Sequence, residues 1–362
     1  MKILVVQDHL RSGGTERQSI LLTRGFAAAG HAATLLTFRP GGALAGELAG
    51  VDHRVLTPVD LGLDWFAPGL LRAVAALAPE VVLCMGRMAN CHAGFIQRRF
   101  PDRIVIGTMR TGKPLPFLFR RSLRRVRHVV ANSHAAKRTL VDAPALPAEK
   151  ITVIHNSLVF PAAPTLVRNE ALRAAHGARP GTTVLLCVAM FRLRKNQREL
   201  VATAAGLPAD LDWQLWFAGD GETKSECERL ARASRLGPRI RFLGWQRDPS
   251  PFYLAADVAV HASWSESLSN FVIEAQAHGL PAVVYEAQGI AECFLPGDTG
   301  FVVARGDRTA FRRHVERLAR AAPAERVARA ERARSYAAAT FDPEQHVAAH
   351  LDLFARLTSG GA

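Results

Sequence analysis

The 362-residue sequence lacks several features that would place it in a specialised class of protein. No run approaches the ~20 apolar residues of a membrane-spanning helix, which argues against an integral membrane protein. The N-terminal MKILVVQDHL is apolar only briefly and has no small-residue cleavage site, so we expect a first strand and no signal peptide. The five cysteines form no C-x-x-C pair, which argues against a zinc site or a disulfide framework and favours reduced, buried thiols in the cytoplasm.

Acidic residues are scarce: 32 aspartates and glutamates face 46 lysines and arginines, for a net charge of +14. Such an excess attracts nucleic acid, a membrane surface or a phosphorylated substrate. The sequence has no zinc-finger spacing, no run of aromatic residues for stacking and no concentrated basic recognition helix. A basic nucleic-acid-binding α/β protein therefore stays only as the alternative from a different class.

What the sequence does contain is an alternation of apolar strands and amphipathic helices over a length that suits two domains. This pattern predicts an α/β fold with a parallel sheet in each half. The proline-rich stretch Phe160–Thr165 separates the halves, so we predict domains at 1–162 and 163–340 and a last helix over Phe341–Leu357. The expected strands are Lys2–Gln7, His31–Phe38, Val81–Met85, Ile104–Thr108, His128–Ala131, Ile151–Ile154, Thr183–Ala189, Leu215–Gly219 and Ile240–Leu243.

The stretch His261–Gly300 organises the second half. It predicts a strand over Asp257–His261, a polar loop, a helix over Asn270–His278 that ends at Gly279, and a strand over Ala282–Tyr285. In such a βαβ unit, ligands bind where the helix begins.

Two carboxylates mark this loop and helix, Glu266 and Glu274. The backbone amides of Ser267, Leu268, Ser269 and Asn270 are expected to be free at the helix start and to stabilise an anion such as phosphate. Because carboxylates repel phosphate but accept hydrogen bonds from sugar hydroxyls, an anion site with an acid on either side suits a nucleotide sugar. We expect Glu274 to face a cleft.

Loss of a diphosphate also requires positive charge or a metal ion. Arg192 and Lys195, in the loop after Thr183–Ala189, provide a guanidinium and an ammonium group. The D-x-D sequence Asp210-Leu211-Asp212 precedes a strand, and we interpret it as accidental.

The ordered string Glu266, Glu274, Gly279, Pro281, Gly289, Glu292 and Gly300 resembles the donor-site signature of the retaining glycosyltransferases of family 4. Arg192, Lys195 and the Asn156 of VIHNS are similar to further family positions. The resemblance implies the GT-B fold: two Rossmann-like domains with parallel sheets that face a central cleft. It implies that the domain at 1–162 binds the acceptor and that the domain at 163–340 binds the donor. The C-terminal residues 341–362 would pack back on the first domain.

The same resemblance implies a role for each candidate residue. Glu274 would hold the ribose, and Glu266 the donor sugar as a catalytic residue together with Arg192 and Lys195. The segment Phe242–Trp245, which includes Gly244, would border the base. Gly13 and Gly14 are similar to the family's N-terminal loop over the donor phosphates.

The implied activity is a metal-independent transfer, with retention, of a sugar from a nucleotide-diphosphate sugar to a hydroxyl acceptor in bacterial polysaccharide, lipopolysaccharide or glycolipid synthesis. No cofactor is expected beyond the UDP- or GDP-linked co-substrate. A nucleotide-sugar epimerase or hydrolase on the same scaffold is the alternative, whereas a phosphorylase would need a pyridoxal phosphate lysine in a recognisable setting.

One departure from the family concerns the acceptor side. Many members carry a histidine after the strand that here ends at Thr108, where this chain has Met109, Arg110 and Lys113. Arg110 either takes the place of that histidine or is a solvated loop arginine. His9 is a further candidate, although neither it nor His92 has a partner that is visible in the sequence.

The segment Pro116–Val126 combines apolar residues with four arginines. It predicts either a basic amphipathic helix on an anionic membrane or a core-packed helix with a wet basic face. The expected location is the cytoplasm, or the inner face of the plasma membrane as a peripheral protein.

Overall fold

The chain folds into two compact α/β units. The computed structural model describes residues 1–11, 13–60, 65–158, 167–234 and 236–359. The first unit comprises Met1–Val159 with Phe341–Ala362, and the second comprises Phe160–Thr340. The predicted linker Phe160–Thr165 and the predicted boundary at residue 162 lie outside the described residues.

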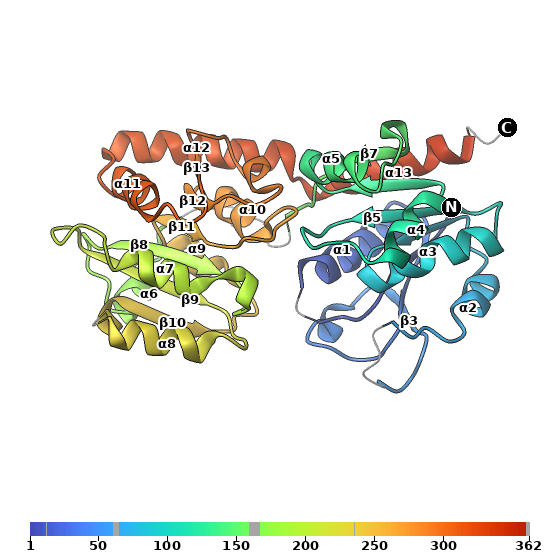
Figure 1. Cartoon of the computed structure of the whole chain (residues 1–362), viewed down its shortest axis with the longest axis horizontal. Coiled ribbons are helices and arrows are strands. Elements are labelled where there is room, and N and C mark those ends of the chain that lie inside the picture. The colour runs from blue at the N-terminus through green and yellow to red at the C-terminus, as the bar shows by residue number, and fades with distance from the viewer. Residues whose placement is uncertain (12, 61–64, 159–166, 235, 360–362) are drawn as a thin grey trace. The chain divides into compact units, whose positions relative to one another are not determined.

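The first unit is built on a seven-stranded sheet in the order β3-β2-β1-β4-β5-β6-β7 (Figure 1). Every adjacent pair of its strands is parallel. The strands are β1 Lys2–Gln7, β2 Ala32–Thr37, β3 Asp52–Val55, β4 Val81–Cys84, β5 Ile104–Met109, β6 His128–Ala131 and β7 Ile151–Val153.

Helices cover both faces of this sheet. On one face α1 and α13 pack over a core that contains Ile20, Phe26 and Phe354, and on the other face α2 to α5 pack over a core that contains Val74, Ile96 and Leu123. The helices are α1 Gly14–Ala28, α2 Leu70–Leu77, α3 Arg87–Arg99, α4 Phe117–Arg125, α5 His134–Asp142 and α13 Pro343–Ser359. The C-terminal helix thus belongs to the first unit.

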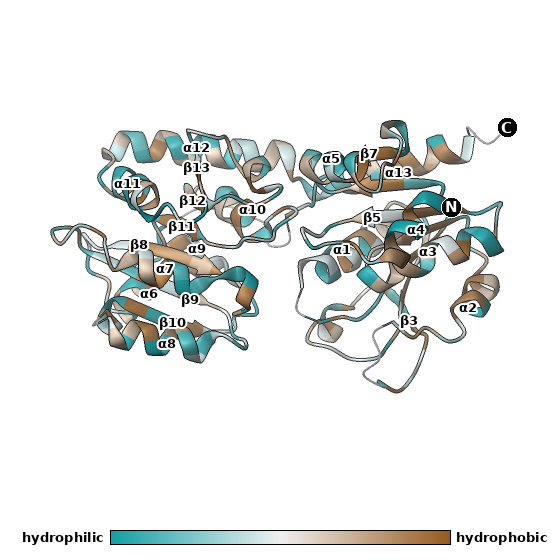
Figure 2. Cartoon of the chain, viewed as in Figure 1, coloured by the Kyte–Doolittle hydropathy of each residue, from teal (hydrophilic) through white to brown (hydrophobic). Residues whose placement is uncertain are grey.

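The second unit repeats the plan with a six-stranded parallel sheet in the order β10-β9-β8-β11-β12-β13. Its strands are β8 Thr183–Val188, β9 Trp213–Ala218, β10 Ile240–Gly244, β11 Val258–His261, β12 Ala282–Tyr285 and β13 Gly300–Val303. Its helices are α6 Glu170–Ala175, α7 Gln197–Ala204, α8 Lys224–Ala233, α9 Ser250–Ala255, α10 Asn270–Ala277, α11 Arg308–Ala319 and α12 Pro323–Thr340. Helix α8 alternates between hydrophobic and hydrophilic residues, as a helix with one side on a sheet requires (Figure 2).

The predicted central unit is confirmed: β11, a polar loop, α10 and β12 follow one another, and Gly279 ends the helix with φ +77°. A side chain is strained in this left-handed conformation, and a Cβ would also approach Arg334 to 2.7 Å.

Strands β3 and β13 are not among the predicted elements. Both lie at the edge of a sheet, and β3 has the polar sequence DHRV with little burial, so it lacks the apolar run that marks a buried strand. The last helix begins at Pro343 and not at Phe341. Pro343 suits the first helical position, and Asp342 Oδ1 accepts a hydrogen bond from the Gln345 amide at 2.8 Å.

Within the described residues, none of the helices combines the length and the apolarity that crossing a membrane would require. All five cysteines are buried free thiols, as expected.

Candidate functional site

The candidate site of the second unit lies where the strand order of its sheet reverses. Strands β8 and β11 are neighbours in the sheet although α7, β9, α8, β10 and α9 separate them in the chain. The connections that leave β8 and β11 diverge to opposite sides, and ligands of open α/β sheets bind in the crevice that this leaves at the carboxyl ends of the strands. Arg192 and Lys195 follow β8, and Glu266 follows β11.

The two loops are joined by hydrogen bonds and an ion pair. The Trp264 amide donates to the Arg194 carbonyl at 3.1 Å, and Ser263 Oγ donates to the same carbonyl at 3.3 Å. Lys195 Nζ forms an ion pair with Glu266 Oε1. The structure therefore brings together the cationic loop and the first of the two predicted carboxylates.

Glu266 is 8% exposed and ionised. Burial by itself would raise the pKa of its carboxyl group, but the Lys195 ammonium and a 2.8 Å hydrogen bond from His261 Nε2 outweigh burial and lower this pKa to about 2. Burial lowers the pKa of His261, so the imidazole is neutral and donates its Nε2 proton. A charged group thus stays fixed at the carboxyl ends of β8 and β11.

Sequence reasoning missed His261, which it treated only as the end of a strand. The imidazole is 1% exposed, packs against the Phe271 ring at 5.5 Å and leaves Nδ1 without a hydrogen-bond partner among the described residues. Its position at the carboxyl end of a buried strand, five residues before Glu266, was the available signal.

Arg192 differs from Lys195 in being exposed. Its guanidinium forms no hydrogen bond or ion pair with the residues that the structure describes, so it is available to an anion. Its backbone carbonyl accepts the Lys195 amide at 2.8 Å, which closes the short helix η3 Leu193–Lys195 and fixes the two residues in one turn.

The start of α10 is less open than predicted. Ser267, Leu268 and Ser269 are 3%, 6% and 2% exposed, and only Asn270 is partly exposed. The Ser269 amide donates to Cys293 Sγ at 3.4 Å, so the prediction of free amides is wrong for this residue. The reason is tertiary: the short helix η5 Ile290–Cys293 packs against α10.

Glu274, which is expected to face a cleft, is buried in the second unit. It is 5% exposed, and its Oε2 accepts a 2.8 Å hydrogen bond from the Tyr253 hydroxyl of α9. Burial, and then the neighbouring Glu274 charge, raise the pKa of Tyr253 well above its ordinary value, so this hydroxyl is a reliable donor. The His278 ring stacks on the Tyr253 ring at 4.8 Å. The carboxylate is thereby fixed by residues that the sequence pattern did not connect to it.

Tyr253→Phe is expected to lower the free energy of unfolding by about 1–3 kcal/mol, because the buried Glu274 carboxylate loses a hydrogen bond. Nucleotide affinity should fall as well, since the carboxylate is no longer oriented. Urea denaturation and calorimetric titration measure the two effects.

The matched control is Tyr285→Phe, because the Tyr285 hydroxyl contacts Thr203 Oγ1 at 3.2 Å away from Glu274. This control should lower stability and leave nucleotide affinity unchanged. Equal affinity losses in both variants would contradict a positioning role for Tyr253.

The residues of the segment predicted to border a base lie in different environments. The Phe242 ring is partly buried and stacks on Phe217 at 5.5 Å against the core, and its expected place beside a base stays a prediction. Trp245 is 45% exposed and remains the residue available for a flat ligand. Between them Gly244 has φ +72°, and its carbonyl accepts the Gly219 amide at 2.7 Å.

The D-x-D carboxylates have structural partners. Asp210 Oδ2 lies 2.7 Å from Arg320 Nη2. Asp212 Oδ2 lies 3.0 Å from Arg179 Nη2 and accepts from Thr182 Oγ1 at 2.7 Å. One oxygen of each carboxylate thus pairs with an arginine of the fold, which supports the interpretation that this match is accidental.

In the first unit, Gly13 and Gly14 follow β1, which is also the strand where that sheet reverses its order. Gly13 is the residue before α1, and a Cβ there would approach Glu16 Oε2 to 2.2 Å, so a larger residue would require the Glu16 carboxylate to move. Their contact with donor phosphates stays a prediction.

The candidate acceptor residues also lie in the first unit, and two of them differ from expectation. His9 has a partner, because its Nε2 lies 3.5 Å from Asp60 Oδ2. Arg110 is not a solvated loop arginine: Nη1 donates to Asn156 Oδ1 at 2.6 Å, and Nε and Nη2 are buried without a hydrogen-bond partner among the described residues. Burial lowers the pKa of Arg110 to about 10.

Lys113 is partly exposed in the loop after β5, and its amide donates to Thr111 Oγ1 at 3.1 Å. His92, which also seemed unpartnered, contacts the Trp65 carbonyl through Nε2 at 3.0 Å.

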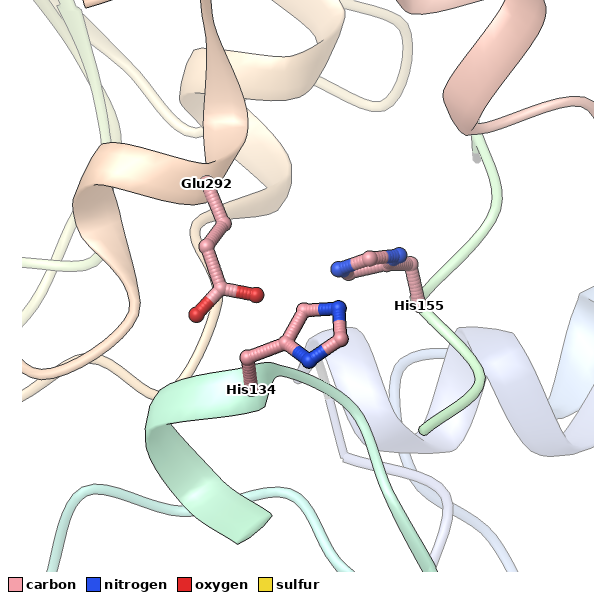
Figure 3. A group of neighbouring side chains, drawn as sticks. All are labelled: His134, His155 and Glu292. Atoms are coloured by element: carbon pink, nitrogen blue, oxygen red, sulfur yellow. The ribbon is translucent and has the colours of Figure 1, made fainter. Parts of the chain in front are cut away.

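Two further histidines of this unit lie together at the carboxyl ends of β6 and β7. The rings of His134, at the start of α5, and His155 are 5.7 Å apart in an edge-on arrangement (Figure 3). His155 also packs edge-on against Phe341 at 5.9 Å. Glu292, which the same figure draws, belongs to η5 of the second unit. The sequence pattern did not indicate this pair.

Comparisons with known proteins match both units. The family described as Glycosyltransferase Family 4 matches residues 12–158, and the one described as Glycosyl transferases group 1 matches residues 182–321. The chain is 34% identical over 172 residues to the lipopolysaccharide core biosynthesis glycosyltransferase LpsE of Rhizobium meliloti, covering 48% of this chain and 49% of that protein. It is 28% identical over 138 residues to the N-acetyl-alpha-D-glucosaminyl L-malate synthase of Bacillus anthracis, covering 38% and 36%. The chain spans about half or less of the length of these curated relatives.

Solved structures share the fold over nearly the whole chain. The Anabaena protein Alr3699/HepE in complex with UDP and glucose has a TM-score of 0.80 at 21% identity and covers 97% of this chain and 99% of its own. Sucrose-phosphate synthase from Thermosynechococcus elongatus has a TM-score of 0.82 at 18% identity and covers both chains fully, at 100% each. At these identities the likeness shows the fold alone.

Proposed function

Because this chain belongs to the group 1 glycosyl transferases of glycosyltransferase family 4, with the GT-B fold, we propose that it transfers a sugar from a nucleotide-diphosphate sugar to a hydroxyl acceptor. The transfer proceeds with retention at the anomeric carbon and without a metal ion. The second unit binds the donor, and the first unit binds the acceptor.

One observation carries the proposal: the loops after β8 and β11 meet where the sheet reverses its order, and they place Arg192, Lys195 and Glu266 in one place. Arg192 is free to pair with phosphate oxygens. Lys195 is held by the buried Glu266 carboxylate, so its ammonium group is oriented before a donor arrives. Fixed charges of this kind cost no reorganisation during the reaction.

The chemistry follows from the donor. The bond between the anomeric carbon and the diphosphate oxygen breaks, and the electron pair leaves with the diphosphate, whose growing negative charge Arg192 and Lys195 stabilise. The acceptor oxygen bonds to the anomeric carbon on the same face, and its proton passes to a phosphate oxygen of the leaving group. Glu266 accepts hydrogen bonds from the donor sugar, and Glu274 accepts them from the ribose.

The acceptor is proposed to be a carbohydrate or a lipid-linked carbohydrate of the bacterial cell surface. The lipopolysaccharide core relative supports this class. Arg110 supports it as well, because its buried guanidinium has nitrogen atoms without a hydrogen-bond partner among the described residues and suits an anionic group on the acceptor.

A calorimetric screen of the whole chain against UDP- and GDP-linked sugars, in the presence and absence of EDTA, tests the donor proposal. One nucleotide sugar is expected to bind with micromolar or tighter affinity, and EDTA should change neither its affinity nor the turnover, because Arg192 and Lys195 provide the positive charge. UDP-glucose is the first probe, since a structural relative binds UDP and glucose.

An affinity that EDTA abolishes would contradict the metal-independent part of the proposal, and no binding across the panel would contradict the donor class. Isomerisation or hydrolysis of the donor without an acceptor would favour the alternative function, an epimerase or hydrolase on the same scaffold.

A further inference from the structure

The helix layer α3 to α5 of the first unit is unusually poor in acidic residues. Between Asp102 and Asp142 the chain contains no aspartate or glutamate, and it carries ten lysines and arginines. Helix α3 has no acidic residue either. Positive side chains on this side of the unit therefore have few local carboxylates with which to pair.

Helix α4 exposes apolar side chains together with these charges. Phe119, Ser122 and Leu123 are buried. Phe117 and Leu118, by contrast, are 72% and 47% exposed. The predicted alternative, a core-packed helix with a solvated basic face, accounts for the three buried residues. It does not explain why Phe117 and Leu118 are exposed, because leaving large apolar side chains in water is unfavourable.

The arginines of α4 fall into two pairs. Arg120 donates to the Leu115 carbonyl and Arg124 to the Pro144 carbonyl, both at 3.0 Å, so these two have structural roles. Arg121 and Arg125 are exposed, and neither forms a hydrogen bond or ion pair through its side chain with any residue that the structure describes. One turn apart on the helix, Leu118, Arg121 and Arg125 form a stripe that is apolar at its start and cationic at its end.

Helix α3 lies beside α4 and continues this pattern (Figure 1). The Ser122 hydroxyl of α4 joins the helices, since it donates to the Cys91 carbonyl at 2.7 Å and accepts from the Gly94 amide at 3.1 Å. On the side of α3 away from the sheet, Phe95 is 38% exposed and is followed by the exposed Arg98. We call Phe95, Arg98, Phe117, Leu118, Arg121 and Arg125 the α3–α4 face.

We propose that the α3–α4 face docks on the surface of an anionic lipid bilayer, with Phe117 and Leu118 entering the headgroup region and the arginines pairing with lipid phosphates. The proposal rests on the proposed function in one respect: it names the surface on which a lipid-linked acceptor is met. Charge complementarity selects the bilayer as the occupant. A second copy would bring unpaired arginines against unpaired arginines, which repel.

Vesicle co-sedimentation of the whole chain tests the proposal. The protein should sediment with vesicles that contain phosphatidylglycerol and phosphatidylcholine, should bind much less to phosphatidylcholine alone, and should be released by rising NaCl concentration. Arg121→Ser with Arg125→Ser, and separately Phe117→Ser with Leu118→Ser, should each weaken binding by about tenfold or more.

The control is Arg229→Ser with Arg232→Ser, which removes the same charge from two exposed arginines of α8 in the second unit. It should bind as the unchanged protein does. No binding to anionic vesicles, equal binding to both kinds of vesicle, or an equal loss in the control would overturn the proposal. A dimer in light scattering that the Phe117→Ser, Leu118→Ser variant abolishes would overturn it in favour of a second copy.

Donor binding separates this proposal from the proposed function. The face variants lie outside the donor-binding unit, so their calorimetric affinity for the nucleotide sugar should equal that of the unchanged protein. Vesicle binding without donor binding would support the membrane-docking proposal and contradict the proposed activity. Donor binding without vesicle binding would support the proposed activity and contradict membrane docking by the α3–α4 face.

Discussion

Replacing Arg192 and Lys195 together with alanine is expected to lower kcat/KM by about a thousandfold or more. Each removes a fixed positive charge from the place where the diphosphate leaves, and the loss of a single such group costs about 10²–10³ in rate. The effect should appear in kcat as well as in KM, because the charge on the leaving group grows towards the transition state. Initial rates with the donor found in the nucleotide-sugar screen measure it.

The single variants divide the effect in a way that the structure dictates. Arg192 is exposed and unpaired among the described residues, so Arg192→Ala should reduce turnover and leave the melting temperature unchanged. Lys195→Ala should lower both, because the buried Glu266 loses its cationic partner. Arg198→Ala is the matched control: Arg198 lies nearby in sequence but pairs with Glu226 at 3.5 Å. Equal losses of turnover in Arg192→Ala and Arg198→Ala would show that the loop acts only through its overall charge.

Glu266→Gln is expected to lower turnover by about 10²-fold. The amide keeps the size of the side chain but removes the negative charge that orients Lys195 and strengthens the hydrogen bond from His261 Nε2. If kcat falls while the affinity for the nucleotide alone is nearly unchanged, Glu266 acts on the donor sugar and not on the base. An unchanged kcat would remove Glu266 from the catalytic residues.

The same variant tests a predicted effect of pH on the stability of the fold. The folded protein holds the pKa of Glu266 at about 2, below the ordinary value of 4.5, so its ionised form stabilises the fold. This stabilisation is complete above pH 4.5 and is lost as the pH falls from 4.5 towards 2. Its size is of order 3 kcal/mol. Urea denaturation at pH 7 and near pH 3 should show a smaller acid loss in Glu266→Gln than in the unchanged protein, and identical acid losses would contradict the buried ion pair.

Much of the fold could be predicted because it depends on local patterns. Buried parallel strands are continuous apolar runs, so β1, β6 and β12 have the predicted bounds. The helix end at Gly279 was also predicted from the sequence. The edge strand β3 was missed because its polar sequence is little buried and lacks an apolar run. The edge strand β13 was missed as well, although most of its residues are buried.

The site residues were predictable where a strand pattern located them. Arg192 and Lys195 follow β8 and Glu266 follows β11, and carboxyl ends of neighbouring parallel strands meet at one edge of a sheet. That β8 and β11 are neighbours depends on the order of strands, which no local spacing reveals. Partners from elsewhere in the chain, namely Tyr253 for Glu274 and Cys293 for the Ser269 amide, were therefore missed.

By itself the sequence determined which residues can carry charge and hydrogen bonds, the alternation of strands and helices, and the family resemblance. Tertiary structure alone decided which of those groups are paired, buried or free. In the folded chain Glu266 pairs with Lys195, Glu274 is buried, and the Ser269 amide before α10 has a hydrogen-bond partner. Arg192, by contrast, is exposed. The reason is physical: the free energy of a charged group depends on burial and on its nearest partners, and those partners come from segments far away in the chain.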